Sequence, residues 1–399
     1  MLAINGGNPI REKMLQYGKQ TLDQSDKDAI MKVLDSNTYL TTGPWVAEFE
    51  RKAREFCGAT YALAVNSGTA ALHCAMVSLD LQSTDEVIVT GLSFVASANC
   101  IVYCGATPIF CDIEEDTMNI DPTKIETLIT ERTKAIIAVD FAGQLCNYTE
   151  LHKLAQKYSL KIIADAAHSF GISLDEKYVG TFADITTTSF HPVKNMTTCE
   201  GGMIFTDNEE LFNKMKAFRQ HGISRDYKER EITCSHYYEM TSLGYNYRIP
   251  DVLCALGTNQ LQKLPVWIKR RNEIAQAYDA AFTKLNSSLE RKVVVPLTQK
   301  YPTAYHIYVI QLEGLDRDTI FRALKAEGIG TNVHYLPIHR HPYYKKNYQT
   351  KEGLLPVAER VYKKIITIPL FPTLSEQDIN DVIAAVDKVV RHYINLSSK

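Results

Sequence analysis

The sequence lacks the features that mark several classes of protein. No stretch approaches the roughly 20 uncharged apolar residues that span a bilayer, and residues 1–7 lack the basic segment and apolar core of a secretory signal. Lys and Arg number 44 and Asp and Glu 46, so the net charge is −2. The chain therefore lacks the basic excess typical of nucleic-acid binders. We expect neither a membrane span nor a nucleic-acid partner.

Paired cysteine patterns are also missing. The nine cysteines are an odd number, and none has C-x-x-C spacing, Cys100 and Cys104 being the closest pair. Most lie inside apolar segments, which is typical of reduced, buried thiols. The sequence thus predicts a cytoplasmic protein without disulfides.

Short apolar segments that alternate with helical patterns make up most of the first 250 residues. Apolar runs occupy residues 62–65, 86–89, 185–190 and 203–205, and three others end at Asp112, Asp140 and Asp165. Continuous apolar strands between helices indicate a mostly parallel sheet covered on both faces. We therefore predict an α/β fold, preceded by an N-terminal arm, a helix at 23–34 and a loop at 41–44.

The last 150 residues have a different pattern. A long helix is predicted from residue 251 to 282, with Pro265 expected to kink or divide it. A strand at 307–311, a helix at 317–326, a loop rich in His and Tyr and two closing helices follow. At 399 residues the chain suggests about two domains, which we place at 1–250 (arm and large domain) and 251–399 (connecting helix and small domain).

Three features could carry chemistry together. Ser67, Gly68 and Thr69 stand between a strand and a helix, where backbone N–H groups suit a phosphate. Asp165 follows an apolar strand, and Lys194 follows the next strand and precedes a Gly pair. Taken singly, Ser67 to Thr69 are more typical of a plain N-cap turn, Asp165 is as consistent with a helix N-cap, and a lone lysine is usually an exposed surface charge. A phosphate cradle, an acid for a pyridine nitrogen and a lysine for an aldehyde are together what pyridoxal 5′-phosphate (PLP) requires.

Longer strings carry a family resemblance. Four strings follow one another along the chain: N-S-G-T-A-A-L-H (66–73), D-A-A-H (165–168), S-F-H-P-V-K-N-M-T-T-C-E-G-G (189–202) and G-Y-N-Y-R-I-P-D (244–251). From about residue 17 to the end, the sequence resembles the DegT/DnrJ/EryC1/StrS sugar aminotransferases. That resemblance implies the fold type I of PLP-dependent transferases and a homodimer with active sites at its interface.

The resemblance also implies roles for individual residues. Lys194 bonds the cofactor aldehyde and later moves a proton as general base and acid, and Asp165 keeps the pyridine nitrogen protonated. His168 lies near the ring, unless it is a core histidine, and Phe94 stacks on the ring, unless it too is simply core. The phosphate is expected to contact Ser67, Gly68, Thr69, Ser189 and, from the partner subunit, Asn246. Arg248 adds charge there or forms a structural ion pair.

A narrower resemblance bears on the substrate. Segments 39–44, 332–339, 341–344 and 368–372 are similar to the pseudaminic-acid branch of the family. This implies transfer of an amino group from L-glutamate to C4 of a UDP-linked 4-keto-6-deoxy-N-acetylhexosamine, giving UDP-4-amino-4,6-dideoxy-N-acetyl-beta-L-altrosamine. The alternative is another nucleotide-linked 4-ketosugar, because Cys199, Ser169 and Ala164 depart from the family pattern. Substrate contacts are expected from Tyr17, Thr41, Thr42, Ser189, Asn246, Arg248, His334 and Tyr335.

Other classes of function are less well supported. His334, His339 and His341 could serve a metal-dependent hydrolase, but no acid lies between them, and we expect no metal. A nicotinamide enzyme would need G-x-G-x-x-G after the early strand. The sugar dehydratases that resemble this family carry histidine where Lys194 stands. A binding protein without catalysis would not need the full catalytic set.

Overall fold

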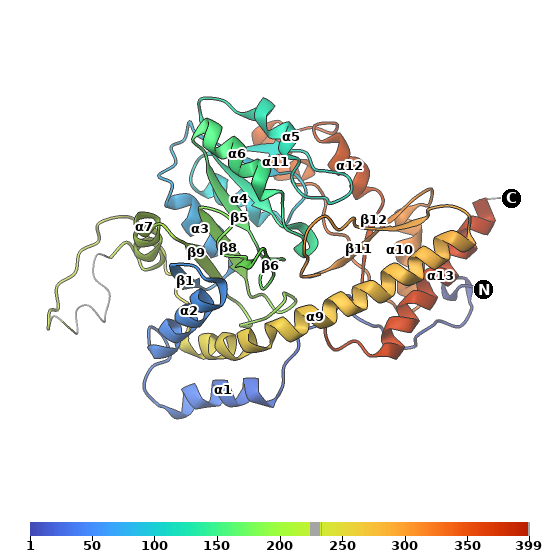
Figure 1. Ribbon diagram of the computed structural model, residues 1–399, viewed down its shortest axis with the longest axis horizontal. Helices are drawn as coiled ribbons and strands as arrows, with labels where there is room; N and C mark the ends of the chain where they lie inside the picture. Colours follow the sequence, from blue (N-terminus) through green and yellow to red (C-terminus); the bar gives the residue numbers. More distant parts are fainter. Residues whose placement is uncertain (224–231, 233, 398–399) are drawn as a thin grey trace.

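A seven-stranded sheet forms the centre of the molecule in the computed structural model, which describes residues 1–223, 232 and 234–397 (Figure 1). Its strand order is β1-β9-β8-β5-β4-β2-β3. Strand β9 is antiparallel to both of its neighbours, and the other pairings are parallel. The strands are β1 (Tyr61–Val65), β2 (Glu86–Thr90), β3 (Thr107–Cys111), β4 (Thr133–Val139), β5 (Lys161–Asp165), β8 (Ile185–Ser189) and β9 (Gly202–Thr206).

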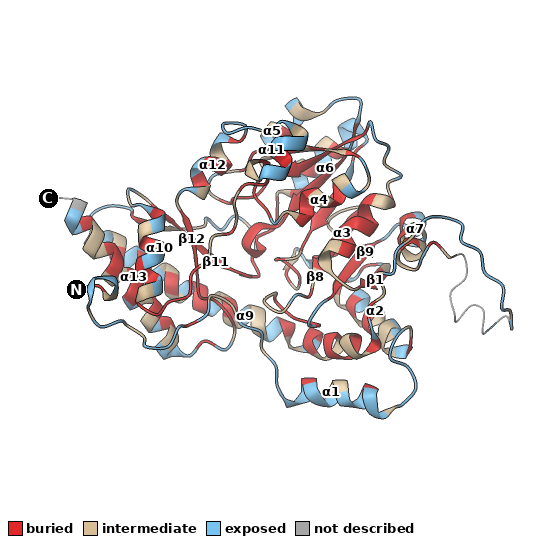
Figure 2. Cartoon of the chain, turned by 180° about the vertical axis from the view of Figure 1, so that it is seen from behind, coloured by how far each residue is buried: buried red, intermediate tan, exposed pale blue. Residues whose placement is uncertain are grey.

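Helices cover both faces of this sheet, as the continuous apolar strands predict. The side chains of a strand alternate between the faces, so neighbouring residues enter different cores. Ile137 packs with α3 and α4, whereas Ile136 packs with α6. Burial is nearly complete along the strands (Figure 2). The helices of this part are α2 (Pro44–Cys57), α3 (Gly68–Val77), α4 (Ala96–Tyr103), α5 (Pro122–Ile125), α6 (Tyr148–Tyr158) and α7 (Glu209–Arg219).

The N-terminal arm carries α1 (Gln24–Asp35), which packs on the long helix α9 (Asp251–Ser288). Asp23 begins α1 with a capping box, and Asp26 accepts hydrogen bonds from Asn259 and Gln260 of α9. The long helix is continuous through Pro265, so this proline does not divide it. Buried residues on both sides of the proline pack into the body, and this packing outweighs its cost of about 3 kcal/mol.

A second sheet, β10-β11-β12, lies beside the C-terminal half of α9 (Figure 1). It contains β10 (Val294–Pro296), β11 (Tyr308–Leu312) and β12 (Ile365–Ile368), covered by α10 (Arg317–Ala326) and α13 (Glu376–Ser397). Strand β12 lies where the sequence predicts only loop and helix, and α2 is also absent from the prediction. No helix among the described residues is long and apolar enough to cross a membrane.

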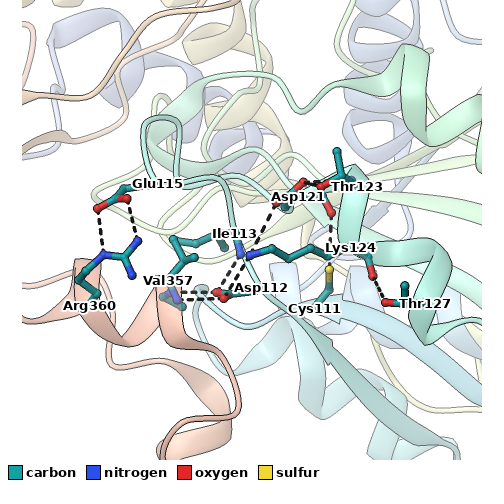
Figure 3. Close-up of polar contacts among 11 residues, drawn as sticks. Cys111, Asp112, Ile113, Glu115, Asp121, Thr123, Lys124, Thr127, Val357 and Arg360 are labelled. Carbon is teal, nitrogen blue, oxygen red and sulfur yellow. Dashed lines mark hydrogen bonds and ion pairs between the residues drawn. The ribbon is translucent and has the colours of Figure 1, made fainter.

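The chain returns to the large sheet between these small-sheet elements. Segment 338–361, which contains α11 (Pro342–Tyr348) and all but the last residue of α12 (Pro356–Tyr362), packs its apolar residues into the same core as α3 and α4. Asp112, just after β3, accepts hydrogen bonds from the N–H groups of Val357 and Ala358 at 2.9 and 2.8 Å (Figure 3). Arg360 pairs with Glu115 beside it. The division at residue 250 stays a prediction.

Candidate active site

A cavity of about 500 Å³ opens where the strands of the large sheet end. Polar groups gather there because the carboxyl ends of parallel strands share one edge. The residues that line the cavity come from the arm, the strand ends and the small-sheet region: Tyr17, Ser67, Gly68, Thr69, Leu72, Ser93, Phe94, Ala96, Ser97, Val139, Asp165, Ala167, His168, Thr187, Thr188, Ser189, His191, Val193, Lys194, Glu200, His306, Asn332, Val333, His334 and Tyr335.

Lys194 extends into this cavity from the loop that follows β8. The loop is held in shape by backbone hydrogen bonds from Lys194 to His191 and from Thr198 to Phe190. Desolvation lowers the pKa of the lysine amine to about 8, although the nearby carboxylate of Asp165 acts in the opposite direction. A larger share of this amine is therefore neutral near neutral pH than in an exposed lysine, as a nucleophile requires.

Asp165 is the last residue of β5 and is only 6% exposed. One carboxylate oxygen accepts a hydrogen bond from Ser97 Oγ at 2.7 Å, and the other from the N–H of Ala167 at 3.2 Å. Burial raises the pKa of this carboxyl, while Ser97 and Lys194 lower it. A cation placed beside it would stabilise its ionised form.

The turn before α3 offers space for a small anion. Ser67 caps the helix by accepting a hydrogen bond from Ala70 N. A methyl group on Gly68 would come within 2.7 Å of Ser189 Cβ, so this close approach of the two segments depends on glycine. Gly68 and Thr69 begin the helix, where unpaired N–H groups and the positive dipole end favour an anion.

Buried histidines form one wall of the cavity. His168 and His306 lie with their ring centroids 4.3 Å apart, and His168 Nε2 is 3.2 Å from the hydroxyl of Tyr335. Burial, with the nearby amine of Lys194, holds the pKa of His168 well below its usual value. Its Nδ1 has no hydrogen-bond partner and is buried. Tyr17 of the arm packs on His334, and the centroids of their rings are 5.4 Å apart.

Most of the predicted site residues therefore line one cavity, but four do not. Thr41 pairs with Pro250 in an isolated bridge, and Asn246 pairs with Gln220. Thr42 and Arg248 line a separate pocket of about 280 Å³. These four residues lie together at another place on the chain, and the cavity around Lys194 contains none of them.

Ser97 and His306 are two of the cavity residues that the sequence analysis did not identify. Ser97 donates a hydrogen bond to Asp165, which lies 68 positions further along the chain. The sequence marks Ser97 only as a second serine, four positions after Ser93. His306 lies against His168, 138 positions away along the chain. Neither stands in a motif, so only the tertiary structure brings them to the site.

The three histidines of the metal hypothesis do not converge. His334 Nδ1 lies 2.8 Å from Thr367 Oγ1, whereas His339 Nε2 lies 2.7 Å from Glu359 Oε1. His341 begins α11. Within residues 1–223 and the described part of 232–397, no group of three ligating side chains could hold a metal ion.

Comparison with known proteins identifies the family. The model of the DegT/DnrJ/EryC1/StrS aminotransferase family matches residues 20–387. The chain belongs to this family. SpsC of Bacillus subtilis, a spore coat polysaccharide biosynthesis protein, is 39% identical over 388 residues, which are 96% of this chain and 98% of SpsC.

Solved structures of aminotransferases match over nearly the whole chain. PseC of Helicobacter pylori, an aminotransferase involved in the biosynthesis of pseudoaminic acid, has a TM-score of 0.88 at 34% identity and covers 95% of this chain and 100% of its own. Spr1654 of Streptococcus pneumoniae, a putative sugar aminotransferase in its PMP-form, has a TM-score of 0.89 at 28% identity, with 97% and 100% covered. The predictions of fold type I and of a PLP-dependent sugar aminotransferase are confirmed.

The cavity fits PLP, the cofactor of these proteins. A buried carboxylate, a desolvated lysine amine and a glycine that leaves room beside Ser189 all face the same space. His168 Nδ1 is a buried polar atom that still lacks a partner. Lys194, Asp165, the Gly68 turn, Ser189 and His168 would hold the cofactor.

Proposed function

We propose that the protein transfers an amino group from L-glutamate to C4 of a UDP-linked 4-keto-6-deoxy-N-acetylhexosamine. The product is then UDP-4-amino-4,6-dideoxy-N-acetyl-beta-L-altrosamine, of the pseudaminic acid pathway. The observation that carries the proposal is that Lys194 and Asp165 face one cavity, which Tyr17, His334 and Tyr335 also line. The likeness to PseC supports the choice of sugar.

Lys194 and Asp165 have separate tasks in this proposal. PLP supplies an aldehyde for amines and a protonated ring that accepts electrons. Lys194 uses its neutral amine to hold the cofactor and afterwards to move one proton at the reacting carbon. Asp165, fixed by Ser97, keeps the proton on the ring nitrogen. His168 and Tyr335, joined by their hydrogen bond, exclude water from the side facing the small sheet.

The proposal includes a homodimer in which each subunit completes the site of its partner. Thr41, Thr42, Asn246 and Arg248 lie away from Lys194 of their own chain, around the smaller pocket. Residues that contact substrate must approach Lys194, and a second copy of the chain can bring them there. Exposed apolar residues near this pocket, such as Tyr39, Leu40 and Tyr245, are suited to such an interface.

We also propose a reducing, cytoplasmic location. All nine cysteines are free, and Cys57, Cys74, Cys100, Cys111, Cys146 and Cys254 are buried. Burial raises the pKa of the buried thiols, which keeps them unreactive.

A substrate panel tests the reaction. The purified holoenzyme is assayed with L-glutamate and UDP- or dTDP-linked 4-ketosugars, and the stereochemistry of the product at C4 is determined by NMR. We expect turnover of the UDP-N-acetyl sugar, and we expect the new amine at C4 to have the configuration of the altrosamine product. Turnover of dTDP-linked hexuloses alone would contradict the sugar assignment, and turnover of none would contradict the whole reaction.

Mixed dimers test the shared site. Lys194→Ala and Arg248→Ala homodimers should both be nearly inactive, because each lacks one half of every site. Co-expression should restore about a quarter of wild-type activity, since about half of the dimers are mixed and each has one intact site. If the mixture stays inactive while both variants fold and dimerise, Lys194 and Arg248 act within one chain and the shared site is wrong.

A further inference from the structure

A second, much smaller cavity lies behind the Lys194 loop. Its volume is about 10 Å³, and four parts of the chain line it: the arm at residues 19–21, the loop that carries Lys194 and Asn195, one face of α9, and Pro372. Gln260 of α9 already joins the arm and the loop directly. Its Nε2 donates to the carbonyl of Thr21 at 3.1 Å, and its Oε1 accepts from the N–H of Thr197 at 3.3 Å.

Three buried polar atoms without partners belong to residues that line this cavity: Thr21 Oγ1, Asn195 Oδ1 and Arg271 Nε. Buried polar groups are nearly always hydrogen-bonded, so three unpartnered atoms on residues that line one small cavity require an explanation. The orientation of the Asn195 amide is fixed, because its Nδ2 donates to the carbonyls of His168 and Phe170 at 3.0 and 3.2 Å. Its Oδ1 is therefore an acceptor still in need of a donor.

Arg271 is unusual in its own right. It is only 2% exposed, and its Nη1 donates to the carbonyls of Tyr305, His306 and Leu370 at 3.1 to 3.2 Å. No carboxylate is recorded among its hydrogen-bond and ion-pair partners in the described chain. Its Nε–H remains a donor.

The chemistry of these atoms selects the occupant. A cation would be repelled by Arg271, and an anion would face the lone pairs of Asn195 Oδ1. A water molecule can accept from Arg271 Nε, donate to Asn195 Oδ1 and bond the hydroxyl of Thr21 in either sense. A cavity of about 10–15 Å³ holds one water when two to four polar partners are present. We propose that Thr21, Asn195 and Arg271 bind one structural water behind Lys194.

This water would fix the position of Lys194 from two sides. Asn195 follows Lys194 in sequence and also holds the turn that carries His168. Thr21 lies four positions after Tyr17, which lines the main cavity. The water thus links the arm to the lysine loop, and Thr21 and Asn195 are positioning residues. Their effect on turnover rests on the proposed function, but the hydration site itself does not.

Thr21→Val tests this link, because valine keeps the shape and removes the hydroxyl. Thr21→Ser keeps the hydroxyl and is the matched control. In a high-resolution crystal structure of the wild-type holoenzyme, a water should lie within hydrogen-bond distance of the three atoms, and it should be lost or displaced in Thr21→Val. Loss of one hydrogen bond should speed cofactor dissociation and lower kcat by about five-fold, with KM nearly unchanged. Thr21→Ser should behave as wild type.

The outcomes separate this proposal from the proposed reaction. No water at this place in the wild-type crystal would overturn the inference, as would identical dissociation rates in Thr21→Val and Thr21→Ser. Inactivity of the wild type on every ketosugar would refute the reaction alone, since the crystal and the cofactor release do not depend on a sugar. A general loss of folding in Thr21→Val would appear in its melting temperature and would not be rescued selectively by serine.

Discussion

Asp140 and Asp165 stand at the ends of neighbouring strands, yet their surroundings are opposite. Asp140 accepts hydrogen bonds from Ser169, Tyr148 and the N–H of Cys146 at 2.6 to 3.0 Å, and it is fully buried. Asp165 faces the cavity and the amine of Lys194. An acid at the end of a strand is therefore not enough to predict catalysis. What distinguishes Asp165 is the open space and the cation beside it.

Removing the amine should have the largest effect. Lys194→Ala is expected to abolish the visible absorption band of the bound cofactor and to lower kcat at least about a thousand-fold, because no other side chain can replace the nucleophile. Absorbance spectra and the amino-transfer assay would measure this. Lys177→Ala is the control and should keep both, because Lys177 is an exposed lysine at the start of the short strand β7 (Lys177–Tyr178), which pairs with β6 (Ser173–Leu174). A Lys194→Ala protein that kept its colour and its activity would show that Lys194 is not the nucleophile.

Neutralising the two aspartates should separate them most directly. Asp165→Asn should lower kcat about a hundred-fold, since an electrostatic partner aimed at the reacting system is lost. Asp140→Asn should change kcat little, because Asp140 does not line the cavity. Steady-state kinetics and circular dichroism of both variants would measure this. Equal losses in the two would mean that strand-end position alone matters.

The pH dependence of cofactor capture sharpens the contrast. With the pKa of Lys194 lowered to about 8, the rate at which the apoprotein binds PLP should rise with pH and level off above that value. Asp165 holds this pKa up, so Asp165→Asn should move the midpoint to lower pH. Asp140→Asn should leave it in place. Stopped-flow absorbance between pH 6 and about 10 measures the midpoint, and a wild-type midpoint near the ordinary 10.5 would contradict the desolvation of Lys194.

Asp140 should instead affect how the free energy of unfolding depends on pH. Burial raises its pKa from 3.8 to about 6, against the hydrogen bonds that it accepts. The folded state therefore binds a proton more tightly than the unfolded state, so this contribution is greatest below pH 3.8 and is lost as pH rises through 6. A change of about 3 kcal/mol corresponds to this difference. Denaturant unfolding across this range should show the stability of wild type falling relative to that of Asp140→Asn as pH rises.

The smallest effects belong to Asp112, the third aspartate after a strand (Figure 3). Asp112→Ala should destabilise the protein by about 1–2 kcal/mol, because two N–H groups at the start of α12 lose their acceptor.

Arg360→Ala should lower the free energy of unfolding by less than about 0.5 kcal/mol, since its ion pair with Glu115 is exposed. Thermal unfolding measures both. If the two changes were equal, burial of Asp112 would not matter.

Local patterns carry the parts of the fold that the sequence predicts well. The helix expected at 317–326 is α10, and the strand expected at 86–89 extends by one residue in β2. The pattern of apolar residues within each of these segments is enough to predict its secondary structure. Strand β12 was missed because four residues between helices carry little signal, although Ile365, Ile366 and Ile368 are apolar.

The site divides in the same way. Lys194, Asp165 and the Gly68 turn stand at strand ends within motifs, so the sequence places them at one edge. Ser97 and His306 come to the cavity only because α4 and the turn before β11 happen to approach it. The unpartnered Asn195 Oδ1 depends on which carbonyls its amide meets, and no local pattern encodes that.

The return of segment 338–361 to the large sheet has a consequence for any attempt to divide the protein. A fragment that ends at residue 250 would leave α3 and α4 without Tyr344, Leu355 and Val361, and so with exposed apolar surface. The complementary fragment would carry those side chains with nothing to cover them. The two halves should therefore be recovered only when they are produced together, as pieces that fold on each other.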